Sequence, residues 1–132
     1  MPTLNAVPIR APFVDWILEG KKTWEIRSVA TNIRGTVGLI KSKSLTVVGT
    51  CEIVDVVGPL TMALIRKNAQ SKLNETPRAC EDCVGLYAWV LGNVRRLVEP
   101  VKYKHPSGAV VWVKLDARKA AEVLAAKALQ VS

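Results

Sequence analysis

Three ionisable side chains stand close together in the stretch GKKTWEIR, residues 20–27, and their types suit proton transfer. Lys22, Glu25 and Arg27 supply an ammonium, a carboxylate and a guanidinium. Burial lowers the pKa of a lysine while a nearby carboxylate raises it, so a desolvated Lys22 could act as a general base near neutral pH. The alternative is a ladder of solvated ion pairs on an edge strand, which would contribute little.

Two elements must position this stretch. Apolar residues at helical spacing predict a short helix over residues 11–19, and Gly20 is typical of a helix end. Residues 23–27 then alternate as a strand. One face of this strand carries Thr23, Glu25 and Arg27. Lys21 and Lys22 lie in the turn, so either can reach that face, and an inward-facing arrangement requires the buried charges to be paired.

The rest of the chain predicts further strands and two more helices. We expect strands over residues 36–41, 45–57, 84–91, 95–101 and 109–115, and helices over 59–73 and 117–129. Residues 74–83 are expected to be irregular, Gly49 to mark a bulge, and Gly92-Asn93 to separate two strands. This order is not an alternating βαβ order, so we predict an α+β fold with a small barrel of five to six mostly antiparallel strands and flanking helices.

Composition limits the class of protein. The 132 residues predict one domain over residues 1–132, with its core at about 4–115, and 49% hydrophobic residues are enough to fill that core. The apolar runs are too short to span a membrane, and residues 1–10 lack the features of a signal peptide, so we expect a cytoplasmic protein. The net charge of +8 favours an anionic or nucleotide-like partner such as RNA.

Three cysteines, an odd number, suit a reducing compartment. Cys80 and Cys83 have C-x-x-C spacing, but a structural zinc site would need a second pair or nearby histidines, and the single histidine, His105, is distant in sequence. We therefore interpret the pair as free thiols in a loop, with metal or redox use as the alternative.

The ordered segments resemble the ASCH domain family, a branch of the PUA-like superfamily. The residues that fit its signature are Gly20, Lys22, Glu25 and Arg27. Residues 35–44 and 87–115 resemble the strand and loop that follow the signature and the closing part of the family, so the resemblance covers about residues 4–115. One departure is the short SKS connection at 42–44, where many relatives have a longer insert. Residues 74–83 are a candidate replacement for the ligand wall that such an insert would build.

The resemblance implies a PUA-like fold and three kinds of function. One group of relatives looks like small amidohydrolases that remove the acyl group from N4-acetylcytidine. There the signature lysine is the base, a threonine stands at the position of Glu25 and is the presumed nucleophile, and a later carboxylate assists. Because this chain has Glu25, either a water or a hydroxyl of Thr23, Ser42 or Ser44 would attack, and we favour the water. We expect no metal or other cofactor, because a lysine and a carboxylate can supply the acid–base chemistry.

On this hypothesis the catalytic residues are Lys22, Glu25 and Arg27, in a monomer that takes a nucleoside substrate. Other residues have candidate roles in binding: Lys41 or Lys43 at the oxyanion, Trp16, Trp24 and Tyr87 in stacking on the pyrimidine, and Lys21, Thr23, Ser42 and His105 as contacts. Glu75 and Glu81 are candidates for the later carboxylate. Trp89 and Trp112 lie in apolar runs and are expected in the core.

Two alternatives belong to other classes. An RNA-cleaving enzyme could use Lys22, Glu25, Arg27 and His105 around a phosphate. A pure RNA-binding module would instead need an outer basic groove, for which the candidates are Arg95, Arg96, Lys102 and Lys104. A non-enzymatic sensor that binds nucleosides without turnover is the third possibility.

Overall fold

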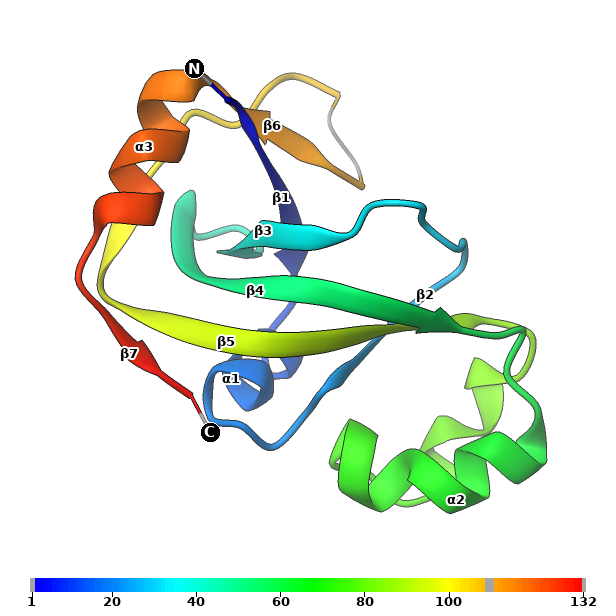
Figure 1. Cartoon of the computed structure of the whole chain (residues 1–132). Helices are drawn as coiled ribbons and strands as arrows, with labels where there is room; N and C mark the ends of the chain where they lie inside the picture. Colours follow the sequence, from blue (N-terminus) through cyan, green and yellow to red (C-terminus); the bar gives the residue numbers. More distant parts are fainter. Residues whose placement is uncertain (1, 109–110, 132) are drawn as a thin grey trace.

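The computed structural model describes residues 2–108 and 111–131. Its seven strands belong to one sheet, with two helices near one end and a third at the other (Figure 1). The strands are β1 (Leu4–Ile9), β2 (Trp24–Arg27), β3 (Gly35–Lys41), β4 (Thr46–Val57), β5 (Tyr87–Lys102), β6 (Val113–Leu115) and β7 (Ala128–Gln130). The helices are α1 (Phe13–Leu18), α2 (Met62–Leu73), the 3₁₀ helix η1 (Arg78–Cys83) and α3 (Ala117–Ala125).

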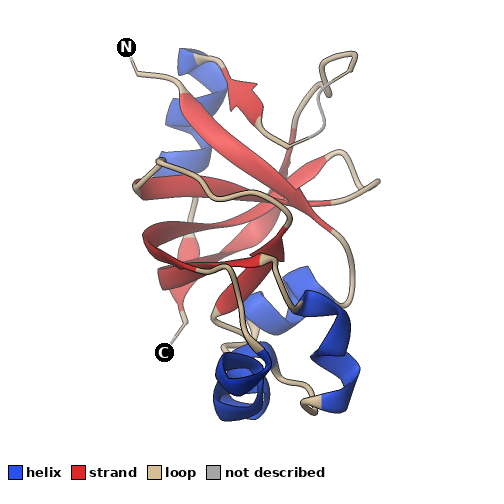
Figure 2. Ribbon diagram, turned by 90° about the vertical axis from the view of Figure 1, so that its right-hand side faces the viewer, coloured by secondary structure: helices blue, strands red, loops and turns tan. Residues whose placement is uncertain are grey.

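The sheet is mostly antiparallel, as predicted, but it is not closed into a barrel. The strand order is β2-β5-β4-β3-β1-β6, with β7 paired to β5 beside this path. Only β1 and β3 run parallel. In the described residues no ladder joins β2 to β6, so these two strands remain edges and the predicted barrel is wrong. Figure 2 shows the strongly twisted sheet with helices above and below it.

Four predicted boundaries are also wrong. The strands expected at 84–91 and 95–101 form the single strand β5, because Gly92-Asn93 makes a bulge against β4 and not a turn, with φ +47° at Asn93. The helix expected at 117–129 ends at Ala125, and β7 follows it. The strand expected at 109–115 begins only at Val113, as β6, because Val111 and Trp112 are not in a strand; residues 109–110 lie outside the described residues. Residues 78–83, expected to be irregular, form η1.

The strand β1 was not predicted. It contains Pro8, and a proline usually excludes a residue from a central strand because it cannot donate a ladder hydrogen bond. Here β6 pairs only with the first half of β1, Leu4 to Ala6, so Pro8 stands where only β3 is its neighbour. The carbonyl of Pro8 accepts a hydrogen bond from Arg27 at the site described below.

The helices begin and end where their caps require. Asn74 ends α2 in the left-handed conformation, and Thr61 starts it by accepting a hydrogen bond from the backbone N–H of Leu64 at 3.2 Å. Asp116 caps α3 in the same way, at 2.8 Å from the N–H of Lys119. Gly20 follows α1 with φ +78°, a value that favours glycine, and turns the chain from the helix toward β2.

Three clusters of buried apolar residues fill the interior. One packs α1 against β3, β4 and β5. A second lies under α3, between β1, β6 and the distal half of β5. The third joins α2 and η1 to β2 through Trp24, Leu73 and Cys80. The first and third clusters fix the ends of α1 and α2 around β2, which carries the ionisable residues. Among the described residues, no helix is both long and apolar enough to cross a membrane.

Candidate functional site

The backbone at Lys22 is held between two helix ends. The N–H groups of Lys21 and Lys22 both donate to the carbonyl of Trp16 in α1, at 2.9 and 3.2 Å. The next N–H, that of Thr23, donates to the carbonyl of Lys72 at the end of α2, at 2.9 Å. Lys22 therefore lies on a short bridge between α1 and α2, immediately before β2 begins.

A pocket of about 530 Å³ opens beside this bridge. Its volume is in the range of small-molecule sites. Its polar or charged side chains are Arg10, Lys22, Glu25, Arg27, Ser28, Glu75, Asp82 and Cys83. The apolar wall comes from Pro8, Ile9, Phe13, Ile26, Leu73, Ala79 and Leu86. The pocket thus joins β1, α1 and β2 to the segment from the end of α2 through η1. Residues of 74–83 do supply a wall, as the sequence suggested.

Lys22 and Glu25 are the charged side chains that the fold buries most completely among the described residues, with 3% and 7% of their surfaces exposed. Burial lowers the pKa of Lys22 from its ordinary value, against the opposing effect of Glu25 and, next, Glu75. Burial raises the pKa of Glu25, although Arg27 and Lys22 oppose this. Both groups are therefore shifted toward their neutral forms, which is the condition for proton transfer near neutral pH.

Arg27 fixes the geometry of Glu25. Its Nε donates to Oε2 of Glu25 at 3.0 Å, and its Nη2 donates to the carbonyl of Pro8 at 2.6 Å. The guanidinium also lies 5.5 Å from the ring centre of Trp89, which is stacked on Trp112 with ring centres 5.4 Å apart. The predicted pairing of Glu25 with Arg27 is confirmed, and Trp89 is a core residue as predicted, whereas Trp112 is half-buried and packs against that core.

The amine of Lys22 is in a different situation. Its nitrogen lies 5.4 Å from the ring centre of Phe13, which is in turn packed edge-on against Trp16. No described carboxylate forms an ion pair or hydrogen bond with this amine; Glu25 and Glu75 act on it only from a longer distance. A buried amine without a paired anion is costly while it is charged. The amine of Lys22 nevertheless lies at a position that lines the pocket.

The predicted binding residues divide into those near the pocket and those away from it. Glu75 lines the pocket, whereas Glu81 does not. Lys21 is exposed and lies 3.4 Å from Glu19. Lys41 is paired with Asp15 at 3.1 Å, outside the pocket wall. The hydroxyl of Thr23 is buried without a hydrogen-bond partner among the described groups, and Thr23 does not line the pocket either.

The remaining predicted contacts lie elsewhere. Trp24 packs in the cluster beneath α2, so it is a core residue. Tyr87 is half-buried in β5, opposite Arg27 in the ladder. The N–H of Ser42 donates to the carbonyl of Ile9, and its side chain lies outside the pocket wall. His105 lies 2.9 Å from the hydroxyl of Tyr103, in another part of the fold.

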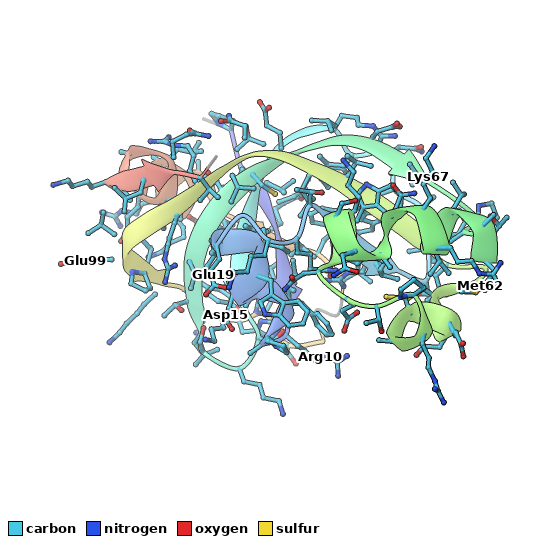
Figure 3. All side chains as sticks on the ribbon, turned by 90° about the horizontal axis from the view of Figure 1, so that it is seen from below. Arg10, Asp15, Glu19, Met62, Lys67 and Glu99 are labelled. Carbon is cyan, nitrogen blue, oxygen red and sulfur yellow. The ribbon has the colours of Figure 1, made fainter. Side chains whose placement is uncertain are left out.

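Several residues of the pocket wall were not named from the sequence as site residues, among them Arg10 and Phe13, and Asp82 and Cys83 were suggested only as part of the segment 74–83. Phe13 was assigned only to the apolar face of its helix. Cys83 carried a signal, the C-x-x-C spacing, but nothing in that spacing indicates that η1 packs against Lys22. Figure 3 shows Arg10 between α1 and the segment of α2 and η1, while Lys67 lies on the far side of α2. Among the described residues, no group of three potential ligands is placed to hold a metal ion.

Comparison with known proteins gives one family. The ASCH domain model matches residues 7–102, which include the whole of β2 and the wall at 74–83. The crystal structure of ASCH from Zymomonas mobilis superposes with a TM-score of 0.67 at 14% identity, covering 97% of each chain. A serine-to-alanine mutant of that protein gives a TM-score of 0.66 at 14% identity, covering 91% of this chain and 93% of the other. No functionally curated protein matches the sequence.

Proposed function

The chain belongs to the ASCH domain family, which is linked to RNA-binding and hydrolase roles, and on this premise we propose that its pocket hydrolyses N4-acylated cytosine nucleosides such as N4-acetylcytidine. The products are cytidine and a carboxylic acid. One observation carries the proposal: a buried lysine amine of lowered pKa, without an ion-pair partner among the described residues, lines a pocket of nucleoside size beside a buried glutamate.

The reaction begins with proton removal. Neutral Lys22 accepts a proton from a water molecule, and the resulting hydroxide attacks the acyl carbon to give a tetrahedral intermediate. The bond between the acyl carbon and N4 then breaks, and the ammonium of Lys22 returns the proton to N4. Water has by then supplied one hydroxyl to the acid and one hydrogen to the amine, so the atoms balance without a cofactor.

The carboxyl groups assist this cycle. Arg27 occupies Oε2 of Glu25, which leaves Oε1 to orient the water or to share the proton. Glu75 is the better candidate for the later carboxylate, because it lines the pocket and Glu81 does not. Arg10 replaces Lys41 as the candidate for stabilising the oxyanion, since Lys41 is bound to Asp15 outside the wall.

Water is also the favoured nucleophile on structural grounds. The hydroxyl of Thr23 is buried outside the pocket wall, and that of Ser44 is bonded to the carbonyl of Lys41 and to Thr46. Neither residue lines the pocket that Lys22 lines. For the pyrimidine, Phe13 offers an aromatic face in the wall, in place of the predicted Trp24 and Tyr87.

The test is direct. Incubation with N4-acetylcytidine should release cytidine and acetate, measured by chromatography, and Lys22→Ala should lower turnover by about 10²-fold or more if Lys22 transfers the proton. The matched control is Lys67→Ala, which removes an exposed lysine on the far side of α2 and should leave turnover unchanged. The proposal fails if the wild-type protein releases no cytidine, or if Lys22→Ala releases it at the same rate.

The same samples distinguish hydrolysis of N4-acetylcytidine from RNA binding without turnover. Arg96, Lys102 and Lys104 are exposed, so a single-stranded RNA could contact them. If the protein retains short RNA in a salt-sensitive way and turns over no N4-acetylcytidine, the family's RNA-binding role is the correct one for this chain.

A further inference from the structure

Glu75, which lines the pocket, accepts from behind the wall a hydrogen bond that neither the sequence nor the proposed reaction requires. The thiol of Cys80 donates to Oε2 of Glu75 at 3.4 Å. We propose that Cys80 is a positioning residue, whose thiol holds the carboxylate of Glu75 toward the pocket and the amine of Lys22. The role of this pair in turnover rests on the proposed function, whereas its effect on Lys22 can be measured without any substrate.

Two separate contacts fix Glu75. Its backbone N–H donates to the carbonyl of Ala69 at 3.1 Å, which is possible because Asn74 adopts the left-handed conformation with φ +56° at the end of α2. Its carboxylate is then fixed by Cys80, which is 1% exposed in η1 and packs against α2 and β2. The helix end places the residue, and the thiol selects the direction of its side chain.

The thiol of Cys80 remains a hydrogen-bond donor over a wide range of pH. Burial, followed by the hydrogen bond to Glu75, raises the pKa of Cys80 to about 12. Cys80 therefore keeps its proton throughout the range in which a lysine of lowered pKa would titrate. A sulfur donor is weak, but its bond to an ionised carboxylate is stronger than one to a neutral acceptor. The thiol can hold Glu75 without adding a charge of its own next to Lys22.

The expected effect follows from the charges around Lys22. Burial lowers the pKa of the amine, and the largest effects that oppose this come from Glu25 on β2 and Glu75 after α2. The smaller effects of Cys80 and Cys83 on η1 require thiolates, which the raised pKa values of both thiols disfavour. Asp82 and Arg10 complete the charged wall, and Arg10 and Arg27 act on Glu25. If Glu75 turns away, one of the two carboxylates that favour the ammonium is lost. The pKa of Lys22 then falls further.

The experiment compares three variants with the wild type. Cys80→Ala removes the donor, Cys80→Ser keeps a donor at the same position, and Cys51→Ala removes an equally buried thiol from the core cluster under α1. The first readout is the NMR titration of the Lys22 side chain in the absence of substrate. We expect its midpoint to move to lower pH in Cys80→Ala and to stay close to the wild type in Cys80→Ser and Cys51→Ala.

The second readout is turnover of N4-acetylcytidine. Cys80→Ala should lower kcat about five- to tenfold, with KM little changed, and should move the acid limb of the pH profile to lower pH, whereas Cys80→Ser should restore both. In a Glu75→Gln background, Cys80→Ala should produce no further shift of the Lys22 midpoint, because the group that it positions has lost its charge. This comparison also separates positioning from a general loss of stability.

The outcomes keep the two proposals apart. A shifted Lys22 midpoint without any turnover in the wild type would support the role of Cys80 and refute the amidohydrolase. An unchanged midpoint in a folded Cys80→Ala protein, or equal midpoints and rates in the alanine and serine variants, would overturn the positioning role. A further shift on adding Cys80→Ala to Glu75→Gln would overturn it as well.

Discussion

Removal of Arg27 should leave Glu25 as an uncompensated buried charge. Arg27 donates to Glu25 at 3.0 Å and to the carbonyl of Pro8, and Glu25 is 7% exposed. Arg27→Met keeps much of the side-chain volume against Trp89 but removes both donors. Breaking a buried pair in this way costs about 3–5 kcal/mol in general. Here the cost of the buried charge is limited, because the carboxyl of Glu25 can take up a proton and become neutral.

Protonation of Glu25 sets an upper limit on the free-energy cost of losing Arg27, and this limit depends on pH. Protonating a carboxyl whose ordinary pKa is 4.5 costs about 3.4 kcal/mol at pH 7 and less than about 1 kcal/mol at pH 5. The pKa of Glu25 is already raised by burial, and the loss of Arg27 raises it further. The charge penalty is therefore absent below the unfolded pKa, grows as the pH rises above it, and is complete once the pH exceeds the folded pKa. The lost bond to Pro8, about 1–3 kcal/mol, persists at every pH.

The assay is urea unfolding at pH 5 and pH 7, followed by tryptophan fluorescence, for Arg27→Met and for Arg27→Met combined with Glu25→Gln. At pH 7 the double variant should be the more stable one, by up to about 3.4 kcal/mol, and at pH 5 the difference should fall below about 1 kcal/mol. A difference that is the same at both pH values would refute the reasoning. So would a double variant that is no more stable than Arg27→Met at pH 7.

Three further predictions concern stability. Lys22→Met should abolish turnover yet raise the free energy of unfolding at pH 7, measured by urea unfolding. Because burial lowers the folded pKa of Lys22, this gain in stability should shrink as the pH rises toward the ordinary lysine pKa of 10.5. Gly49→Ala should lower the free energy of unfolding by more than about 2 kcal/mol, because a Cβ there would lie 2.6 Å from the carbonyl oxygen of Arg95. A Cβ at Gly92 meets only an ordinary contact at 3.4 Å, so Gly92→Ala should lower the free energy of unfolding clearly less in the same assay. Asp116→Ala should lower the free energy of unfolding by about 1 kcal/mol through loss of the α3 cap, and an unchanged midpoint would show that the cap does not limit stability.

The local rules recovered the elements that are governed by their own residues. The apolar spacing over residues 59–73 predicted α2, which begins after the Thr61 cap, and Gly20 predicted the end of α1. The bulge expected at Gly49 is present, since the ladder of β4 shifts between Val47 and Gly49. The same rules failed where a partner strand decides the outcome. Residues 128–130 continue a helical pattern, yet they pair with β5 at Leu97 to Arg95, because the Ala128–Gln130 segment can cover that edge.

The site was predictable only in part, for a similar reason. Lys22, Glu25 and Arg27 belong to one short stretch, and strand alternation placed Glu25 and Arg27 on one face. Alternation alone favoured a solvated ladder of ion pairs, and the family resemblance was needed to predict a buried site. The partners of these three residues in the pocket come from three other segments. Arg10 follows β1, which was missed, while Glu75 precedes η1 and Cys83 ends it, in a segment that was expected to be irregular. Tertiary packing of α2 on Trp24 places these segments, and no local pattern encodes that packing.

The short connection between β3 and β4 explains why the wall at 74–83 is central to the site. Lys41 and Thr46 pair directly in the ladder, so the four residues between them form a tight turn. That turn is not among the pocket-lining segments, whereas Glu75, Ala79, Asp82 and Cys83 are. The bond from the N–H of Thr23 to the carbonyl of Lys72 joins the start of β2 to the end of α2. This backbone contact ties the segment of Lys22 to the end of α2, shortly before Glu75, so the position of α2 sets how these two pocket residues lie relative to each other.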